Sequence, residues 1–211
     1  MLRKGLESRA RLIQTTSRLM AVKSLSDLTV AEIAREAGCS KSNFYLYFGN
    51  VLDAVLAAVK DVSMGTPEIL QLLNKPWVCY ADTCAFLRAY LLHWRCHKDV
   101  LRVRLNLSMA GEQQFIDAEL AATVKVFEAL TAKIAAHQST LSIEDRLHAP
   151  SSAGALLAMI ERMAAYGPVK ENDRQITEEG VIDAMARIIN KTIFDGATRS
   201  APANPSSVPS R

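Results

Sequence analysis

The chain has 211 residues, of which 49% are apolar and 22% charged, so it can bury a core in one or two domains. Its mean hydropathy is +0.06, and the lack of an uncharged apolar run of about 18 residues excludes a predicted membrane span. Four cysteines without a CxxC pair exclude a disulfide-stapled secreted domain and a zinc knuckle, and the N-terminal residues lack the apolar segment of a signal peptide. We therefore expect a cytoplasmic protein with reduced thiols.

The net charge of +3 is distributed unevenly along the chain. Residues 1–60 carry nine Lys or Arg against five Asp or Glu, whereas residues 61–211 carry sixteen against seventeen. The positive excess is therefore N-terminal. This asymmetry is typical of a small head that binds a polyanion, attached to a larger and nearly neutral body.

The N-terminal region predicts three helices in close succession. An apolar stripe predicts the first over residues 7–22. The second begins at Thr29 in a T-x-x-E capping box and ends at Gly38, because glycine readily takes the left-handed conformation that ends helices. Ser40 can cap a third helix, which runs to about Tyr47. A helix, a short glycine-containing turn and another helix have the spacing of a helix-turn-helix.

The third predicted helix combines rings with small polar residues. Phe44 and Phe48 fall on one side with Tyr45 beside them, which predicts a broad buried face, whereas residues 41–43 form the N-terminal turn. In a helix-turn-helix, the N-terminal residues of the second helix approach base edges while flanking donors hold phosphates. The pattern favours a DNA-reading helix over the alternative of an aromatic-rich core helix. The residues expected at the DNA are Thr29, Ser40, Lys41, Ser42, Asn43, Tyr45 and Tyr47.

The stretch SLSDLTVAEIAREAGCSKSNFYLYFGNVLDAVLAAV, residues 24–59, resembles the DNA-binding domain of the TetR family of bacterial transcriptional regulators. The family pattern runs T-[VI]-x-x-I-A-x-x-A-G-[VC]-S-x-x-x-[FLI]-Y-x-[YH]-F. Two positions depart from the family: Val51 stands where a lysine commonly meets a phosphate, and Ser42 replaces a glycine of the recognition helix. The matching positions are Thr29, Val30, Ile33, Ala34, Ala37, Gly38, Ser40, Tyr45, Tyr47 and Phe48.

Beyond residue 60 the sequence predicts a helical body. The segment GTPEILQLLNKP, residues 65–76, indicates an irregular connection because it carries two prolines. Residues 139–150 form a polar loop closed by a proline, and the Pro- and Ser-rich residues 197–211 are expected to be disordered. Helical periodicity predicts helices over residues 77–97, 99–110, 113–138, 152–166 and 177–194. The expected fold is all-α, with a three-helix DNA-binding domain over residues 1–50 and a ligand-binding and dimerisation domain over residues 51–196.

The C-terminal region is also similar to the branch of the family that contains the ethionamide-resistance regulator EthR. The similarity rests on HKDV after the long helix and MIER in the penultimate one. It implies an elongated apolar tunnel for a small-molecule effector inside the body. For every candidate the alternative is an ordinary core position, since rings and methionines at helical spacing commonly form a core. The candidate tunnel residues are Phe86, Tyr90, Trp94, Met109, Phe127, Met159 and Met163.

The last two predicted helices carry broad apolar faces that something must cover. In TetR-like proteins these helices pair with those of a second subunit, so the resemblance implies a homodimer. Completing the core of a single chain is the alternative. The candidate interface residues are Leu156, Ile160, Ile182, Met185 and Ile189.

Three other functions are alternatives to DNA binding. His93 and His97 lie one helical turn apart and could share a metal ion in a metal-responsive regulator, but no cluster of Cys or carboxylates elsewhere matches them, so we expect no metal and no cofactor. GxSxG, P-loop, GxGxxG and HExxH motifs are absent, so we expect no enzyme. A helical adaptor without DNA binding is the third. The favoured function is a homodimeric repressor that a largely apolar small molecule releases from a palindromic, double-stranded DNA operator.

Overall fold

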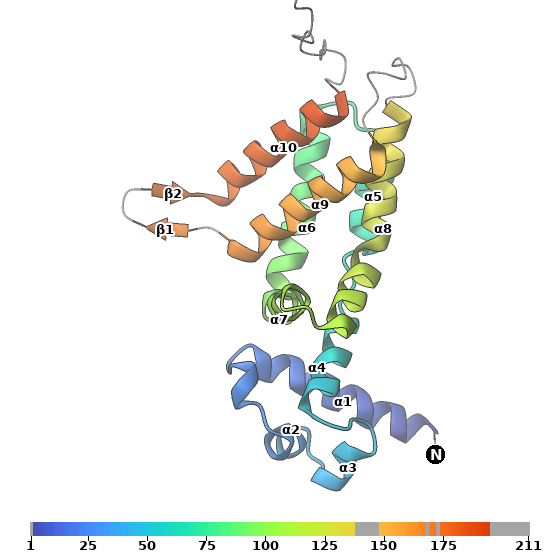
Figure 1. Cartoon of the computed structure of the whole chain (residues 1–211), viewed down its shortest axis with the longest axis vertical. Coiled ribbons are helices and arrows are strands. Elements are labelled where there is room, and N and C mark those ends of the chain that lie inside the picture. Colours follow the sequence, from blue (N-terminus) through green and yellow to red (C-terminus); the bar gives the residue numbers. More distant parts are fainter. Residues whose placement is uncertain (1, 138–147, 168, 172–173, 195–211) are drawn as a thin grey trace, which may run out of the picture.

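The computed structural model describes residues 2–137, 148–167, 169–171 and 174–194. Within these residues a small N-terminal body and a larger C-terminal body follow one another along the long axis of the molecule (Figure 1). The elements of the N-terminal body are α1 (Leu2–Met20), a 3-10 turn η1 (Leu25–Asp27), α2 (Val30–Glu36), α3 (Lys41–Tyr45) and α4 (Val51–Lys60), of which α4 leads into the C-terminal body.

The predicted helix caps of the N-terminal body are confirmed. The Thr29 hydroxyl accepts a hydrogen bond from the Glu32 backbone N–H at 3.2 Å, and the Ser40 hydroxyl accepts one from the Asn43 N–H at 3.1 Å. Gly38 joins α2 to α3 with φ at +69°, a conformation that costs a glycine little. The Glu32 carboxylate forms an ion pair with Lys23 at 2.7 Å, so only the hydroxyl half of the expected capping box is observed.

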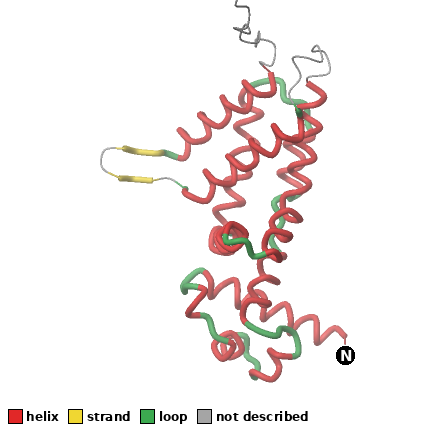
Figure 2. Tube along the Cα trace, viewed as in Figure 1, coloured by secondary structure: helices red, strands yellow, loops and turns green. Residues whose placement is uncertain are grey.

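The C-terminal body consists of helices and one small β-hairpin. The all-α fold class is confirmed, with the hairpin as an addition that projects from the body between the last two helices (Figure 2). No helix among the described residues is long and apolar enough to cross a membrane. The elements are α5 (Pro67–Asn74), α6 (Tyr80–Cys96), α7 (Lys98–Met109), α8 (Gln113–His137), α9 (Ala149–Tyr166), β1 (Val169–Glu171), β2 (Arg174–Ile176) and α10 (Glu178–Phe194).

The irregular connection predicted over residues 65–76 is wrong, because Pro67–Asn74 is the helix α5. Pro67 occupies the first turn, where its missing N–H removes no helical hydrogen bond, and the Thr66 hydroxyl caps the helix by accepting from the Ile69 N–H at 3.4 Å. Burial of Ile69 and Leu73 then holds α5 against the body. The prolines here start and follow a helix.

The predicted polar loop over residues 139–150 is also corrected at its end, because α9 begins at Ala149 with Pro150 in its first turn. The remainder of that loop falls mostly within residues 138–147, which lie outside the described residues. The disorder predicted for residues 197–211 likewise lies outside them.

Two hydrophobic cores stabilise the two bodies, and α8 contributes to both. Phe115 and Ala118, in its first two turns, belong to the core around Ile33, Phe44 and Val55 in the N-terminal body. Further along, α8 supplies residues to the core of the C-terminal body, which also contains most buried residues of α6, α9 and α10. The α8 residues in that second core are Val126, Leu130 and Ile134.

Candidate nucleic-acid interface and ligand cavity

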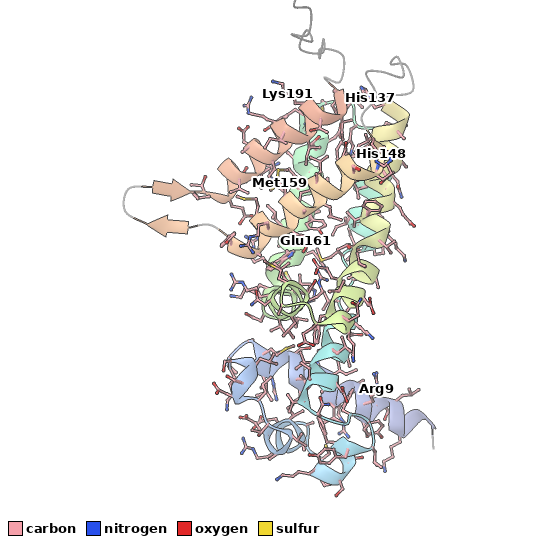
Figure 3. All side chains as sticks on the ribbon, viewed as in Figure 1. Arg9, His137, His148, Met159, Glu161 and Lys191 are labelled. Atoms are coloured by element: carbon pink, nitrogen blue, oxygen red, sulfur yellow. The ribbon has the colours of Figure 1, made fainter. Side chains whose placement is uncertain are left out.

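Helix α3 is fixed to the N-terminal body by two rings. Phe44 is fully buried and Phe48 is 5% exposed, with their ring centroids 5.5 Å apart. The Arg9 guanidinium of α1 lies 5.3 Å from the centre of the Phe48 ring (Figure 3 labels Arg9). These contacts hold α3 from one side and leave its other side at the surface.

Tyr45 does not lie on the buried face where the sequence placed it, because 57% of its surface is exposed. Helix α3 has only five residues, and a step of about 100° from Phe44 turns the Tyr45 side chain away from the core. Its ring meets the Phe44 ring at nearly a right angle, with the centroids 5.7 Å apart. Leu46, at 76% exposure, continues this outward surface.

The other residues expected at the DNA surround this surface. Lys41 and Ser42 are exposed, Asn43 and Tyr47 are partly exposed, and the exposed Ser42 hydroxymethyl causes no steric conflict where family members carry glycine. Thr29 and Ser40 are exposed too, but their hydroxyls are engaged as helix caps. The predicted residues are thus exposed or partly exposed at the surface of the N-terminal body.

Val51 begins α4 and is partly buried against the N-terminal core. The first turn of α4 is capped within the chain, since the Asn50 side chain accepts from the Asp53 N–H and Asp53 accepts from the Gly49 N–H, both at 2.9 Å. A valine here keeps the packing of α4 and offers no cation to a phosphate.

A cavity of 660 Å³ lies among α7, α8 and α9 in the C-terminal body. Most of its wall is apolar, and polar groups enter mainly through Glu119, Thr123, Glu161 and Arg162. Pockets of this size and composition are typical of small-molecule sites. The wall residues are Leu105, Ser108, Ile116, Glu119, Leu120, Thr123, Val124, Phe127, Gly154, Leu157, Ala158, Glu161 and Arg162.

The predicted tunnel residues do not meet in one cavity. Phe127 lies on the wall of the 660 Å³ cavity, whereas Trp94 and Met163 border a second pocket of 270 Å³ near the start of α10. Phe86 and Tyr90 are fully buried in the core. The two remaining candidates are Met159, partly buried beside that core, and Met109, which is 66% exposed at the end of α7.

A buried polar network lies behind the cavity and was not anticipated from the sequence. The Glu161 carboxylate, 5% exposed, accepts hydrogen bonds from the Tyr90 hydroxyl, from Trp94 Nε1 at 3.1 Å and from Arg104 Nη2 at 3.4 Å. Figure 3 labels Glu161 on α9. Burial and the neighbouring Glu161 charge raise the pKa of Tyr90, which keeps its hydroxyl in the donor form.

A sequence signal for this network does exist. Arg104 follows the buried Val100 and Leu101 by four and three residues, so it falls on the apolar stripe of α7. Glu161 similarly follows the buried Leu157 by four residues. Charged residues at positions that periodicity assigns to the core are typical of paired buried groups.

The two histidines of the metal hypothesis lie close together, with ring centroids 4.7 Å apart. Burial, followed by repulsion from His97, lowers the pKa of His93. Among the described residues no group of three or more His, Cys, Asp or Glu side chains could hold a metal ion. The metal-responsive alternative therefore gains no support from the geometry.

The five residues predicted for the dimer interface are all buried within the single chain. Their exposed fractions lie between 0% and 5%, and all five belong to the core of the C-terminal body. A second subunit has almost no surface left to cover on them. Their position matches the alternative of completing the core. The five are Leu156, Ile160, Ile182, Met185 and Ile189.

Comparison with family models gives two matches. Residues 12–51 match the model described as bacterial regulatory proteins, tetR family, and residues 73–203 match the model described as tetracyclin repressor-like, C-terminal domain. Comparison with curated protein sequences gives no significant match. The narrower resemblance to the EthR branch stays a prediction.

Several solved structures share the fold. A protein from Mesorhizobium loti described as a TetR-family transcriptional regulator has a TM-score of 0.64 at 13% identity, over 88% of this chain and 96% of that one. A tetR-family regulator from Streptomyces coelicolor has a TM-score of 0.62 at 17% identity, over 90% and 82%. The fatty acid degradation regulator FadR from Bacillus halodurans has a TM-score of 0.60 at 12% identity, over 88% and 94%. At these identities the likeness shows the fold alone.

The buried network predicts a specific pattern of stabilities. Arg104→Met should lower the free energy of unfolding by about 3–5 kcal/mol, because it leaves the Glu161 carboxylate buried without its cation. Arg104→Met/Glu161→Gln should recover much of that loss, since no buried charge remains unpaired. Arg187→Met, which removes an exposed pair with Asp183, should change stability little. Urea unfolding measures all three, and equal losses in the single and double variants would contradict the pairing.

Proposed function

The chain belongs to the TetR family of bacterial regulatory proteins, and we propose that it is a homodimeric repressor that a largely apolar small molecule releases from a palindromic DNA operator. Members of this family are DNA-binding transcription factors rather than enzymes, and they bind small-molecule effectors and act as dimers. The proposal assigns the exposed surface of α3 to DNA and the 660 Å³ cavity to the effector.

The position of α8 supports the binding of the effector in this cavity. Glu119 and Thr123 of α8 line the cavity, while Ala118, one residue earlier, is packed in the core of the N-terminal body. The Ala122 carbonyl accepts a hydrogen bond at 2.9 Å from the N–H of Met64, in the segment that follows α4. A ligand that displaces α8 therefore acts on the body that carries α3.

The segment that follows α4 is closely packed against α8. A Cβ atom placed on Gly65, beside α8, would lie 2.9 Å from the Lys125 Cβ, which is closer than such atoms approach in proteins. Because packed interiors have few voids, a shift of α8 requires a matching shift of this segment. An effector can weaken DNA binding only by preferring the shifted arrangement, and a 100-fold loss of affinity needs about 2.7 kcal/mol of preference.

The DNA assignment is supported by the surface of α3. Lys41 supplies a cation, Ser42 and Asn43 offer short hydrogen-bonding groups, and Tyr45 offers a hydroxyl on a ring anchored by Phe44. Contacts of these kinds to phosphates and to base edges are common in helix-turn-helix complexes. Two other cations of the N-terminal body, Arg18 and Arg35, contact Glu36 at 3.5 Å and 3.3 Å.

For the homodimer we propose the outward faces of the last two helices. On α10, Ala184 is exposed and Ile188 is 48% exposed, while Ala155 is exposed on α9. Small residues allow helices to approach closely, and Ile188 is a large apolar side chain that a partner could bury. This assignment keeps the helices that the resemblance implied and changes the residues.

Lys41→Ala tests the DNA contact. If Lys41 neutralises a phosphate, its loss should reduce the steepness of log K against log salt by about 0.9 on a fixed duplex. Lys60→Ala, at the exposed end of α4 away from α3, is the matched control and should leave the slope unchanged. Fluorescence anisotropy over a series of salt concentrations gives both slopes. An unchanged slope for Lys41→Ala would remove this residue from the interface.

Ile188→Glu tests the assembly. A charge on the outward face of α10 should give folded monomers by analytical ultracentrifugation, because the partner would have to bury it. In vitro selection with the unmodified protein should yield a palindrome with half-sites about 34–36 Å apart or a multiple of this, and the monomers should lose affinity for it. Leu92→Glu, on the 51% exposed Leu92 of α6, is the control and should stay dimeric. A dimeric Ile188→Glu would place the interface elsewhere.

A further inference from the structure

A second pocket, of 270 Å³, lies between the ends of α6 and α9 and the starts of α7 and α10. It is separate from the 660 Å³ cavity, because no residue lines both. Trp94 connects the two, since it lines the smaller pocket while its Nε1 donates a hydrogen bond at 3.1 Å to Glu161 on the wall of the larger one. Pockets for drug-sized molecules have about 300–1,000 Å³, so this one suits a smaller ligand.

The wall of this pocket carries an excess of positive charge. Arg95, Lys98 and Arg102 are three cations, and Glu178 is the one carboxylate among the described residues that line the pocket. Arg95 Nη1 lies 2.6 Å from Glu178 Oε2, so these two charges neutralise each other. Lys98 and Arg102 are therefore left without a counter-charge on the wall.

These two cations are neighbours on α7. They stand four residues apart, where like charges on a helix repel each other, and an anion between them relieves that repulsion. Arg102 donates from Nε and Nη2 to the Ala165 carbonyl at 3.3 Å and 3.2 Å, which positions its guanidinium at the end of α9 and leaves its charge in place. The Lys98 ammonium makes no ion pair or hydrogen bond with any described residue. Both side chains are exposed, so an anion can reach them from solvent.

The more buried part of the wall is apolar. Trp94 and Val181 are buried, and Leu91, Met163 and Ala164 are partly buried. An apolar group packed on them gains about 25 cal/mol for each Å² removed from water. An inorganic anion would leave this surface uncovered, and a neutral hydrocarbon would leave the two cations unpaired. The pocket therefore selects a molecule that has both an apolar body and an anionic group.

We infer that this pocket binds a small carboxylic acid in its ionised form, with the apolar body on Trp94 and Met163 and the carboxylate at Lys98 and Arg102. Carboxyl groups with an ordinary pKa of about 4 are ionised at neutral pH, and a carboxylate accepts hydrogen bonds from both kinds of cation. The site goes beyond the proposed function and does not depend on it, because the effector of that function occupies the larger cavity.

Two matched probes, 3-phenylpropanoate and 3-phenylpropanamide, test the charge requirement with the full-length protein and no DNA. Isothermal titration calorimetry should give a Kd for the carboxylate at least about fivefold below that for the amide, and added salt should weaken only the carboxylate. Lys98→Gln should lower the ratio of the amide Kd to the carboxylate Kd by about threefold, as expected for a partly solvated charge pair. Lys191→Gln, on an exposed lysine at the other end of α10 (Figure 3), is the matched control and should leave the ratio unchanged.

Two substitutions on α9 test the location of the site. Ala164→Phe places a ring in the smaller pocket and should abolish binding of 3-phenylpropanoate, whereas Ala158→Phe places one in the larger cavity and should leave its Kd unchanged. Circular dichroism shows that each variant is folded, and the exposed Lys98→Gln decides the matter if Ala164→Phe does not fold. The inference is overturned by equal binding of the two probes, by a ratio that Lys98→Gln does not change, by full binding to folded Ala164→Phe, or by no binding of 3-phenylpropanoate.

Discussion

Helix α8 is packed into both hydrophobic cores, and this double attachment decides how the molecule can respond to a ligand. Its first two turns pack among residues that also hold α3, whereas its later turns belong to the core of the C-terminal body, where α8 contacts α5 and α9. Between these two segments, Glu119 and Thr123 face the cavity. A change in the contacts of α8 at the cavity therefore also changes its contacts in the N-terminal body, because packed interiors repack rather than deform smoothly.

Hydrogen bonds to Glu161 fix the wall of the cavity that lies opposite α8. Apolar packing has no preferred direction, but hydrogen bonds do, and one carboxylate here receives donors from α6 and α7 while it sits on α9. Three helices are thereby held in one relative orientation. Movement on ligand binding is then expected on the α8 side of the cavity, which points it toward the N-terminal body.

Features that depend on residues close together in the sequence could be predicted, and features that depend on distant residues could not. The caps at Thr29 and Ser40 and the turn at Gly38 depend on residues at most a few positions away, and the sequence predicted all three. The helix α5 was missed because Pro67 was taken as a breaker, although the preceding threonine and the buried positions after it are typical of a helix start. Tyr45 was misplaced because a step of about 100° along α3 turns its side chain away from the side of the buried Phe44.

Helical periodicity could not predict which helices, distant in the sequence, pack against one another. Apolar spacing predicts that one side of α10 is covered, but Ile189 shows that the cover can be the same chain rather than a second one. Arg104 and Glu161 lie 57 residues apart in sequence, so their pairing depends on how α7 and α9 pack. The same holds for the cavity, whose wall joins α7, α8 and α9 and includes only Phe127 of the residues proposed for a tunnel.

The most direct test of the coupling through α8 fills the cavity from its far side. Gly154 of α9 lies on the wall, and a Cβ atom there would meet the Phe127 ring of α8 at 3.8 Å, an ordinary contact. Gly154→Phe should press on α8 and lower the affinity for the selected palindrome by about tenfold or more without any ligand, whereas Gly154→Ala should bind like the unmodified protein. Anisotropy titrations of folded, dimeric variants measure both. Equal affinities for Gly154→Phe and Gly154→Ala would contradict the account.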